Sequence, residues 1–260
     1  MWKHLTHPNI VPLLGITLTP LQLISAWMPG GELKEYVTSH PDMDRLGLVG
    51  APSIRTGSHL RTSQLTGIAD GLNHLHSRNM IHGDLKGVRD SRDTYLMIVL
   101  TSGQPNILVD DSGSPQITDF GLAMVAQTQD SIRSLQGEHG HTARWTAPEI
   151  LNEQGTHSKE ADVFSFAMVM VEVRCRYCTG RSTTGGKSLF IITQVFTGEV
   201  PFHPYLPAAA MLAILDAKRP ARPAHPNLTD ELWELMRRCW NQDPHLRPEM
   251  PVVFQKLRGS

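Results

Sequence analysis

The pattern of hydrophobic and polar residues near the N-terminus differs from the pattern in the rest of the chain. Two short apolar runs, 12–16 and 21–26, predict strands, and the turn residues in 27–31 predict a linker after them. Beyond Glu32 helical patterns dominate, interrupted by short hairpins. Helices are predicted at 65–76, 162–172, 232–240 and 252–257, and a long loop at 124–145. The pattern therefore predicts an α+β chain whose larger, later part is mostly helical.

Composition and charge exclude several classes of protein. With 260 residues, 40% of them hydrophobic, the chain is long enough for one large domain or two small ones. A net charge of −1 gives no basic surface for nucleic acid or for an anionic membrane, so neither is expected as a partner. No apolar run approaches a membrane span, and no signal-peptide pattern opens the chain. Three cysteines argue against a disulfide scaffold and fit a reducing compartment, so we expect an intracellular, cytoplasmic protein.

Six short motifs, which occur in a fixed order, point to one family. They are HPNIVPLLG from His7, HGDLKG from His82 continuing as PNILVD from Pro105, ITDFGLA from Ile117, TARWTAPE from Thr142, DVFSFAMVMVEVFTGEVPF from Asp162 with one segment removed, and CWNQDPHLRP from Cys239. From Leu5 to the C-terminus the chain resembles the eukaryotic protein-kinase domain, specifically its tyrosine-kinase-like group. The resemblance implies a protein-kinase-like fold with a β-rich N-lobe and a mostly helical C-lobe. It also implies ATP-dependent phosphoryl transfer to a protein substrate.

The resemblance implies a role for each of the polar residues in the second and third motifs. Asp84 matches the catalytic base, which accepts the proton of the substrate hydroxyl, and Lys86 matches the residue that steadies the phosphoryl group. Asn106 and Asp119 match the Mg²⁺ ligands, which are few because phosphates and water supply the other oxygens. Lys86, together with Thr142, implies Ser or Thr rather than Tyr as the acceptor. ATP and Mg²⁺ are therefore the expected cofactors.

The resemblance also assigns the nucleotide-base side of the site. Ser25 falls at the gatekeeper position, and Ala26 to Met28 fall at the hinge, whose backbone contacts adenine. No regulatory partner is indicated by these residues.

Three structural contacts are implied in the same way. Glu149 should form a buried ion pair with Arg247, which would anchor the end of the activation segment. Asp162 should hold the backbone of the catalytic loop, and Trp2 occupies the register of a residue that packs towards Phe120.

Three segments interrupt the family pattern. Family spacing puts the metal-binding Asn five residues after the catalytic Asp, but 88–104 lies between Gly87 and Pro105, and its removal restores that spacing. Removing 49–64 gives a continuous helical pattern, RLGLLTGIADGLNHLH. Removing 173–194 lets an apolar helix run directly into VFTGEVPF.

All three segments begin with Val and end with Gln. Val codons begin with GT and one Gln codon is CAG, which are the letters that open and close a spliceosomal intron. Our hypothesis is that the segments are unspliced introns translated in frame. The alternative is ordinary loop insertion, since loops tolerate added residues well. Sequencing the mature transcript across the three joins distinguishes the two, because continuous coverage of the segments would exclude introns.

The N-terminal part matches only a portion of the kinase N-lobe. The Gly-rich loop, the strand-borne Lys and the helix-borne Glu of the family do not precede His7, and family spacing puts that Glu two positions upstream of Met1. We therefore expect 1–31 to be a truncated remnant of the N-lobe and hinge, and 32–260 to be the C-lobe.

Three functions are compatible with these residues. The chain is an ATP-dependent Ser/Thr protein kinase in its full-length, correctly spliced form, or a pseudokinase that binds or scaffolds without turnover. The third alternative is a non-functional fragment from an incorrect gene model. Because nucleotide-binding elements are missing, and because 88–104 separates Asp84 from Asn106, we expect the chain as printed to be inactive.

Overall fold

The order of strands and helices confirms the predicted α+β class. A computed structural model of the chain describes residues 2–33, 35–36, 57–87, 106–120, 143–152, 155–172, 175–176, 194–195, 200–223 and 228–259. The strands are β1 Leu13–Leu18, β2 Leu21–Ser25, β3 Gly31–Glu32, β4 Ile107–Val109, β5 Pro115–Ile117, β6 Cys175–Arg176 and β7 Gln194–Val195. The helices are η1 Trp2–His4, α2 Gly57–Ser77, α5 Pro148–Leu151, α6 Lys159–Glu172, α7 Pro207–Leu215, α8 Asp230–Cys239, η5 Pro244–Leu246 and α9 Met250–Gly259.

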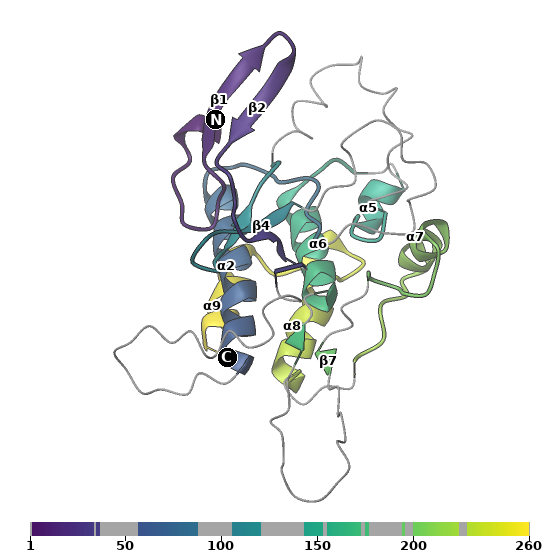
Figure 1. Cartoon of the computed structure of the whole chain (residues 1–260). Helices are drawn as coiled ribbons and strands as arrows, with labels where there is room; N and C mark the ends of the chain where they lie inside the picture. Colours follow the sequence, from purple (N-terminus) through teal and green to yellow (C-terminus); the bar gives the residue numbers. More distant parts are fainter. Residues whose placement is uncertain are drawn as a thin grey trace, which may run out of the picture.

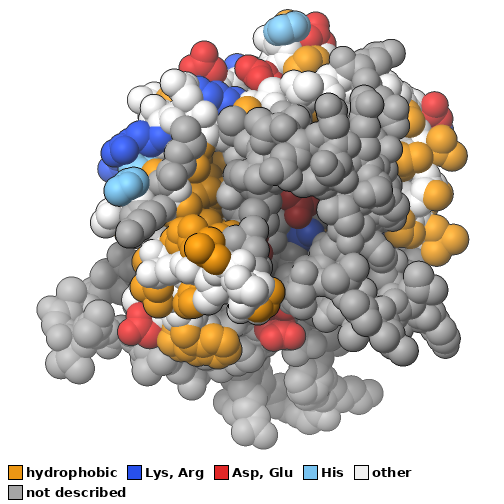
Figure 2. Space-filling view, turned by 90° about the horizontal axis from the view of Figure 1, so that it is seen from above, with side chains coloured by type: hydrophobic (Ala, Val, Ile, Leu, Met, Phe, Trp, Pro, Cys, Tyr) orange, Lys and Arg blue, Asp and Glu red, His pale blue; other side chains and the backbone are white. Residues whose placement is uncertain are grey.

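Strands β1 and β2 form an antiparallel hairpin that projects from one end of the molecule (Figure 1). The strands predicted at 12–16 and 21–26 are confirmed, but β1 runs further towards the turn because its pairing with β2 continues to Leu18 opposite Leu21. Every second side chain of β1 is exposed, and these three are the apolar Leu14, Ile16 and Leu18. Figure 2, which looks down on this end of the molecule, shows hydrophobic side chains at the surface.

A second, three-stranded sheet ties the start of the chain to its middle. The strand order is β3-β4-β5, all antiparallel, with Gly31 opposite Val109 and Ile107 opposite Ile117. The N-terminal segment joins the edge of this sheet, because Val11 N–H donates to the Ile117 carbonyl at 2.9 Å. The short strand β3 has no hydrophobic pattern of its own, and its pairing with β4 is what makes it a strand.

The N-terminal segment around Asn9 also packs closely against α2. The carbonyl oxygen of Asn9 lies so close to α2 that a Cβ added at Gly71 would be 2.6 Å from it. A Cβ at Gly67 would similarly come within 2.8 Å of Asn9 Nδ2, which itself donates to the Pro115 carbonyl at 2.8 Å. Two glycines one helical turn apart therefore form the groove that seats this segment.

Helix α6 forms the centre of the helical part (Figure 1). It packs against α8, α2 and η5. Its side chains are buried nearly all round, as expected for a run as apolar as 163–171. The helices predicted at 232–240 and 252–257 are confirmed as α8 and α9. No helix in the described part of the chain is long and apolar enough to cross a membrane.

The ends of the three interrupting segments are only partly described. Helix α2 begins at Gly57, inside 49–64, so the last part of that segment is helical and Gln64 is buried. Strand β6 pairs with β7, which brings the two ends of 173–194 together. The remainder of these segments, and the predicted loop at 124–145 as far as residue 142, lie outside the described residues.

Candidate functional site

The segment that follows α2 carries the first two predicted catalytic residues. We call His82–Gly87 the catalytic loop. Lys86 Nζ lies 2.8 Å from Asp84 Oδ2, and the Lys86 side chain is buried whereas the Asp84 side chain is 42% exposed. Asp84 is therefore paired on one side and open to solvent on the other. Such a carboxylate can accept a proton from an incoming hydroxyl group.

Asn106 joins this pair from the other end of 88–104. Its backbone N–H donates to the Lys86 carbonyl at 3.1 Å. Its side-chain Nδ2 donates to the Asp84 carbonyl at 2.5 Å and to Asp84 Oδ2 at 3.1 Å. Our expectation that 88–104 separates Asp84 from Asn106 is therefore wrong in space, because the two ends of the segment meet. The inactivity inferred from that separation loses this support.

Asp119 lies next to Asn106 because Thr118 N–H, one residue earlier, donates to the Asn106 carbonyl at 3.0 Å. The backbone of Asp119 has a φ of +57°, in the left-handed region that Asp tolerates better than most residues. Burial raises the pKa of the Asp119 carboxyl, and the nearby Lys86 opposes that shift. A partly buried carboxylate that resists ionisation is a site where a cation would be stabilising. Figure 2 shows acidic and basic side chains at the bottom of a hollow on this side of the molecule.

Aromatic rings pack behind Asp119 and fix its position. Phe120 is buried between Trp2, at 4.7 Å between ring centroids, and His82, at 6.4 Å. The predicted packing of Trp2 towards Phe120 is thus confirmed, and the Trp2 indole N–H also donates to the Val11 carbonyl at 2.9 Å. Burial lowers the pKa of His82 despite three nearby carboxylates. A neutral, buried His82 therefore supports the loop by packing.

Asp162 holds the start of the catalytic loop, as predicted. Its carboxylate accepts the backbone N–H groups of His82 and Gly83, both at 2.8 Å, and lies 2.8 Å from His76 Nε2. Because Asp162 is buried in α6, the loop is fixed to the centre of the helical part. Charge-assisted hydrogen bonds of this kind are stronger than neutral ones.

The donor set at the end of the loop fits Mg²⁺. No group of three or more His, Cys, Asp or Glu residues in the described ranges is arranged to hold a metal ion. Asn106 and Asp119 would supply one amide and one carboxylate instead. Mg²⁺ binds through one or two such oxygens together with substrate phosphates and water. Because Asn106 uses Nδ2 to bind Asp84, its amide oxygen remains the atom suited to a cation.

The residues predicted to contact adenine lie where the hairpin joins the helical part. Ser25 ends β2 and is partly buried. Ala26 N–H donates to the Pro12 carbonyl at 2.9 Å, and Met28 is buried, with its carbonyl accepting from Gly31 N–H at 3.0 Å. These bonds tie the linker to the N-terminal segment at Pro12 and to the start of β3 at Gly31.

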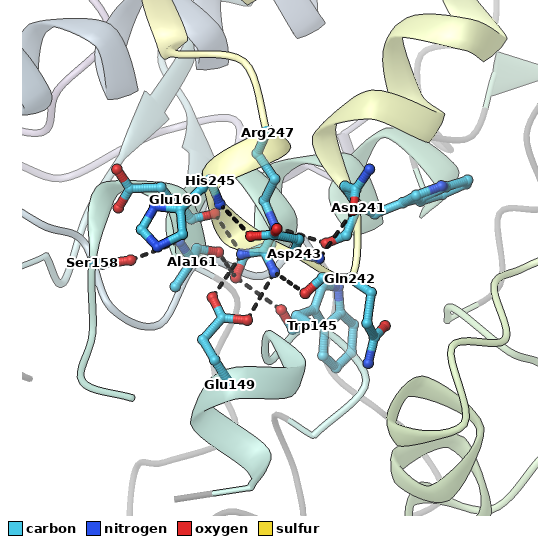
Figure 3. Close-up of polar contacts among 12 residues, drawn as sticks. Trp145, Glu149, Ser158, Glu160, Ala161, Asn241, Gln242, Asp243, His245 and Arg247 are labelled. Carbon is cyan, nitrogen blue, oxygen red and sulfur yellow. Dashed lines mark hydrogen bonds and ion pairs between the residues drawn. The ribbon is translucent and has the colours of Figure 1, made fainter. Parts of the chain in front are cut away.

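The predicted ion pair between Glu149 and Arg247 is confirmed. Arg247 Nη1 and Nη2 donate to the two Glu149 oxygens at 2.6 and 2.7 Å (Figure 3). The same guanidinium donates to the carbonyls of Asn241 at 2.9 Å and Glu160 at 3.0 Å, and it lies over the Phe164 ring. The start of α5 is therefore fixed to α6 and to the η5 region.

One buried carboxylate at this site was missed by the sequence analysis. Glu172 Oε2 accepts from Gly87 N–H at 3.1 Å and from the indole N–H of Trp145 at 2.8 Å. The carbonyl of Trp145 in turn accepts from Ser165 Oγ at 2.8 Å. The available signal was a single charged residue that ends the apolar run 163–171, since a buried acid is normally paired.

Comparison with known proteins agrees with this geometry. The chain matches the family described as protein tyrosine and serine/threonine kinase over residues 1–89 and 103–257. It is 30% identical, over 97% of its length, to a protein named as a probable serine/threonine-protein kinase of Dictyostelium discoideum. It is 28% and 26% identical, each over 98% of its length, to the serine/threonine-protein kinases STY17 and STY46 of Arabidopsis thaliana. The chain spans 15% of the first relative and 35% of each of the other two.

Proposed function

The chain belongs to the protein tyrosine and serine/threonine kinase family, and on this premise we propose that its site transfers the terminal phosphoryl group of ATP to a Ser or Thr of a protein substrate. Members of this family generally use ATP and Mg²⁺. The observation that carries the proposal is the cluster of Asp84, Lys86 and Asn106, which is held together by hydrogen bonds across 88–104.

In the proposed reaction each of these side chains has a separate task. The hydroxyl oxygen of the acceptor bonds to the terminal phosphorus, and the bond from that phosphorus to the ADP oxygen breaks. The hydroxyl proton passes to Asp84, whose exposed carboxylate faces solvent. Lys86, a buried cation beside Asp84, orients that carboxylate and favours negative charge on the moving phosphoryl group.

Mg²⁺ bound by Asn106 and Asp119 would supply positive charge against the nucleotide phosphates. Support for this assignment is the hydrogen bond from Thr118 N–H to the Asn106 carbonyl, which brings Asp119 next to Asn106. The linker at Ser25, Ala26 and Met28 would contact the adenine base, since backbone hydrogen bonds at Ala26 and Met28 hold it between β2 and β3.

The preference for Ser or Thr follows from Lys86 and Thr142, although Thr142 itself lies outside the described residues. The relatives named above are serine/threonine-protein kinases, which supports the same choice. Because the reaction consumes ATP, we place its action inside the cell.

We further propose that 1–31 belongs to the N-lobe and hinge, that 32–260 is the C-lobe, and that the three segments are additions to it. The family match omits 90–102, which lies inside 88–104. Direct joining of Gly87 to Pro105 would turn the hydrogen bond from Asn106 N–H to the Lys86 carbonyl into the i to i+3 bond of a β-turn. This closure supports a kinase loop that needs no inserted residues.

The experiment that tests the function compares Asp84→Asn with Asp119→Asn, using the exposed Asp216→Asn as the control. Phosphorylation of Ser, Thr and Tyr peptides and Mg²⁺-dependent ATP binding are measured on the chain as printed and on a version lacking 49–64, 88–104 and 173–194. Asp84→Asn should abolish transfer and leave binding nearly intact, whereas Asp119→Asn should weaken both.

The outcomes separate the alternatives. ATP binding without transfer in either version would indicate a pseudokinase, and absence of both would indicate a non-functional fragment. Transfer that survives Asp84→Asn, or a preference for Tyr, would contradict the roles assigned above.

A further inference from the structure

A buried carboxylate at the C-terminal end of α6 has no task in the reaction described above. Glu172 is 2% exposed. Its Oε2 accepts hydrogen bonds from the backbone N–H of Gly87 and from the indole N–H of Trp145. Burying a carboxylate is costly unless its partners compensate, so these bonds have to be well formed in the folded protein.

Glu172 and Asp162 hold the two ends of the same loop. They are ten positions apart on α6, which corresponds to about 15 Å along a helix. The catalytic loop, His82–Gly87, advances five residues, and an extended chain of that length reaches roughly 16–18 Å. The loop can therefore run alongside α6, with its first amides on Asp162 and its last amide on Glu172.

We propose that Glu172 is a positioning residue for phosphoryl transfer, acting through Gly87 on Asp84 and Lys86. Both catalytic side chains lie between the two carboxylate contacts, so fixing both ends restricts the whole loop. Through Trp145 the same oxygen also fixes the segment that leads to α5. This inference rests on the proposed function, because it concerns the geometry of that same site.

Contact at Gly87 requires a glycine. A Cβ added there would lie 2.7 Å from Glu172 Oε2, so a side chain at this position would push the carboxylate away. The contact also occurs where two of the interrupting segments begin, since 88–104 follows Gly87 and 173–194 follows Glu172. The hydrogen bond between Gly87 and Glu172 explains how the catalytic loop keeps its geometry although 88–104 follows it in the chain.

The test uses the full chain and three variants. Glu172→Ala removes the acceptor, Glu172→Gln keeps its shape and one acceptor oxygen, and Glu160→Gln is a matched control with an exposed carboxylate on the same helix. Backbone amide exchange is measured residue by residue along the catalytic loop, together with kcat and KM for phosphoryl transfer.

Glu172→Ala should speed exchange of the Gly87 amide about tenfold or more, while the amides of His82 and Gly83 stay protected by Asp162. Its kcat should fall about tenfold to a hundredfold with KM for ATP unchanged, since a small displacement of catalytic groups has effects of that size. Glu172→Gln should keep most of the protection of the Gly87 amide and most of kcat, and Glu160→Gln should change neither quantity. If Glu172→Ala does not fold, the Gln variant should still show exchange that is slightly faster than in the unaltered chain at Gly87 and unchanged at His82 and Gly83.

Exchange that rises equally at His82, Gly83 and Gly87, or that stays unchanged at Gly87, would show that Glu172 supports only overall stability. Selective exchange at Gly87 with an unaltered kcat would overturn the proposal as well. Selective exchange in a chain that transfers no phosphate at all would instead leave the loop contact in place and refute the proposed function.

Discussion

Replacing Arg247 by Ala should destabilise the protein more than any surface substitution. The Arg247 side chain is fully buried and its partner Glu149 is only 16% exposed. Arg247→Ala would leave the Glu149 carboxylate without its bidentate partner, and it would remove the donor to the carbonyls of Asn241 and Glu160. Breaking a buried pair from one side costs about 3–5 kcal/mol, because the remaining charge stays desolvated.

Glu149→Gln should lower the free energy of unfolding by less, about 1.5–3 kcal/mol, since the hydrogen bonds from Arg247 to the carbonyls of Asn241, Glu160 and Gln242 remain. The loss is still substantial because a second guanidinium, that of Arg219, also lies 5.1 Å from the Phe164 ring centroid. Burial, and next the charge of Arg247, lowers the pKa of Arg219 to about 10. Without the negative charge of Glu149 these two cations repel each other with less compensation.

The assay is urea denaturation at neutral pH, which reports the free energy of unfolding. Arg237→Ala is the control, because Arg237 pairs with Glu234 at 3.0 Å on the surface of α8 and its loss should stay within about 0.5 kcal/mol. If Arg247→Ala lost less than about 1 kcal/mol, or no more than Arg237→Ala, the pair would behave as a surface pair and the reasoning from burial would be wrong.

Three further predictions concern the metal site, the packing of the N-terminal segment and the interrupting segments. Because burial raises the pKa of Asp119 above the ordinary value of 3.8, its proton competes with Mg²⁺, so Mg²⁺-dependent ATP binding should strengthen as pH rises through that higher pKa. Titrations of the chain with ATP and Mg²⁺ at several pH values should show this dependence, and the same titrations of Asp119→Asn should not. If the pH dependence persists in the variant, another group causes it. Gly71→Ala should lower the free energy of unfolding by about 1–3 kcal/mol, because the new Cβ would lie 2.6 Å from the Asn9 carbonyl oxygen. The control Gly15→Ala should change the free energy of unfolding little, because there is open space around Gly15. Equal losses of stability in the two variants would contradict the close packing at Gly71. Deleting 88–104 should raise the free energy of unfolding by about 2 kcal/mol from loop-closure entropy alone, and a deletion variant that melts at a lower temperature would show that these residues are part of the fold.

Much of the catalytic site could be predicted from the sequence because its recognisable units are short. Asp84 and Lys86 are two residues apart, and Asp119 and Phe120 are adjacent, so each pair can be recognised within one short motif. The strands at 12–16 and 21–26 and the helices α8 and α9 follow from local periodicity, which depends only on neighbouring residues. The ion pair of Glu149 with Arg247 was inferred because the family resemblance links two distant motifs.

Other features depend on contacts that no local pattern contains. Family spacing in the printed chain suggested that 88–104 separates Asp84 from Asn106, yet hydrogen bonds bring the two together. Gly87 and Glu172 are 85 positions apart, and only the packing of the catalytic loop along α6 makes them partners. Local residue types decide which segments form helices, strands and turns. Which buried donor meets which acceptor is decided only when the whole core packs, because a carboxylate such as Glu172 has to find its hydrogen bonds wherever the fold brings them.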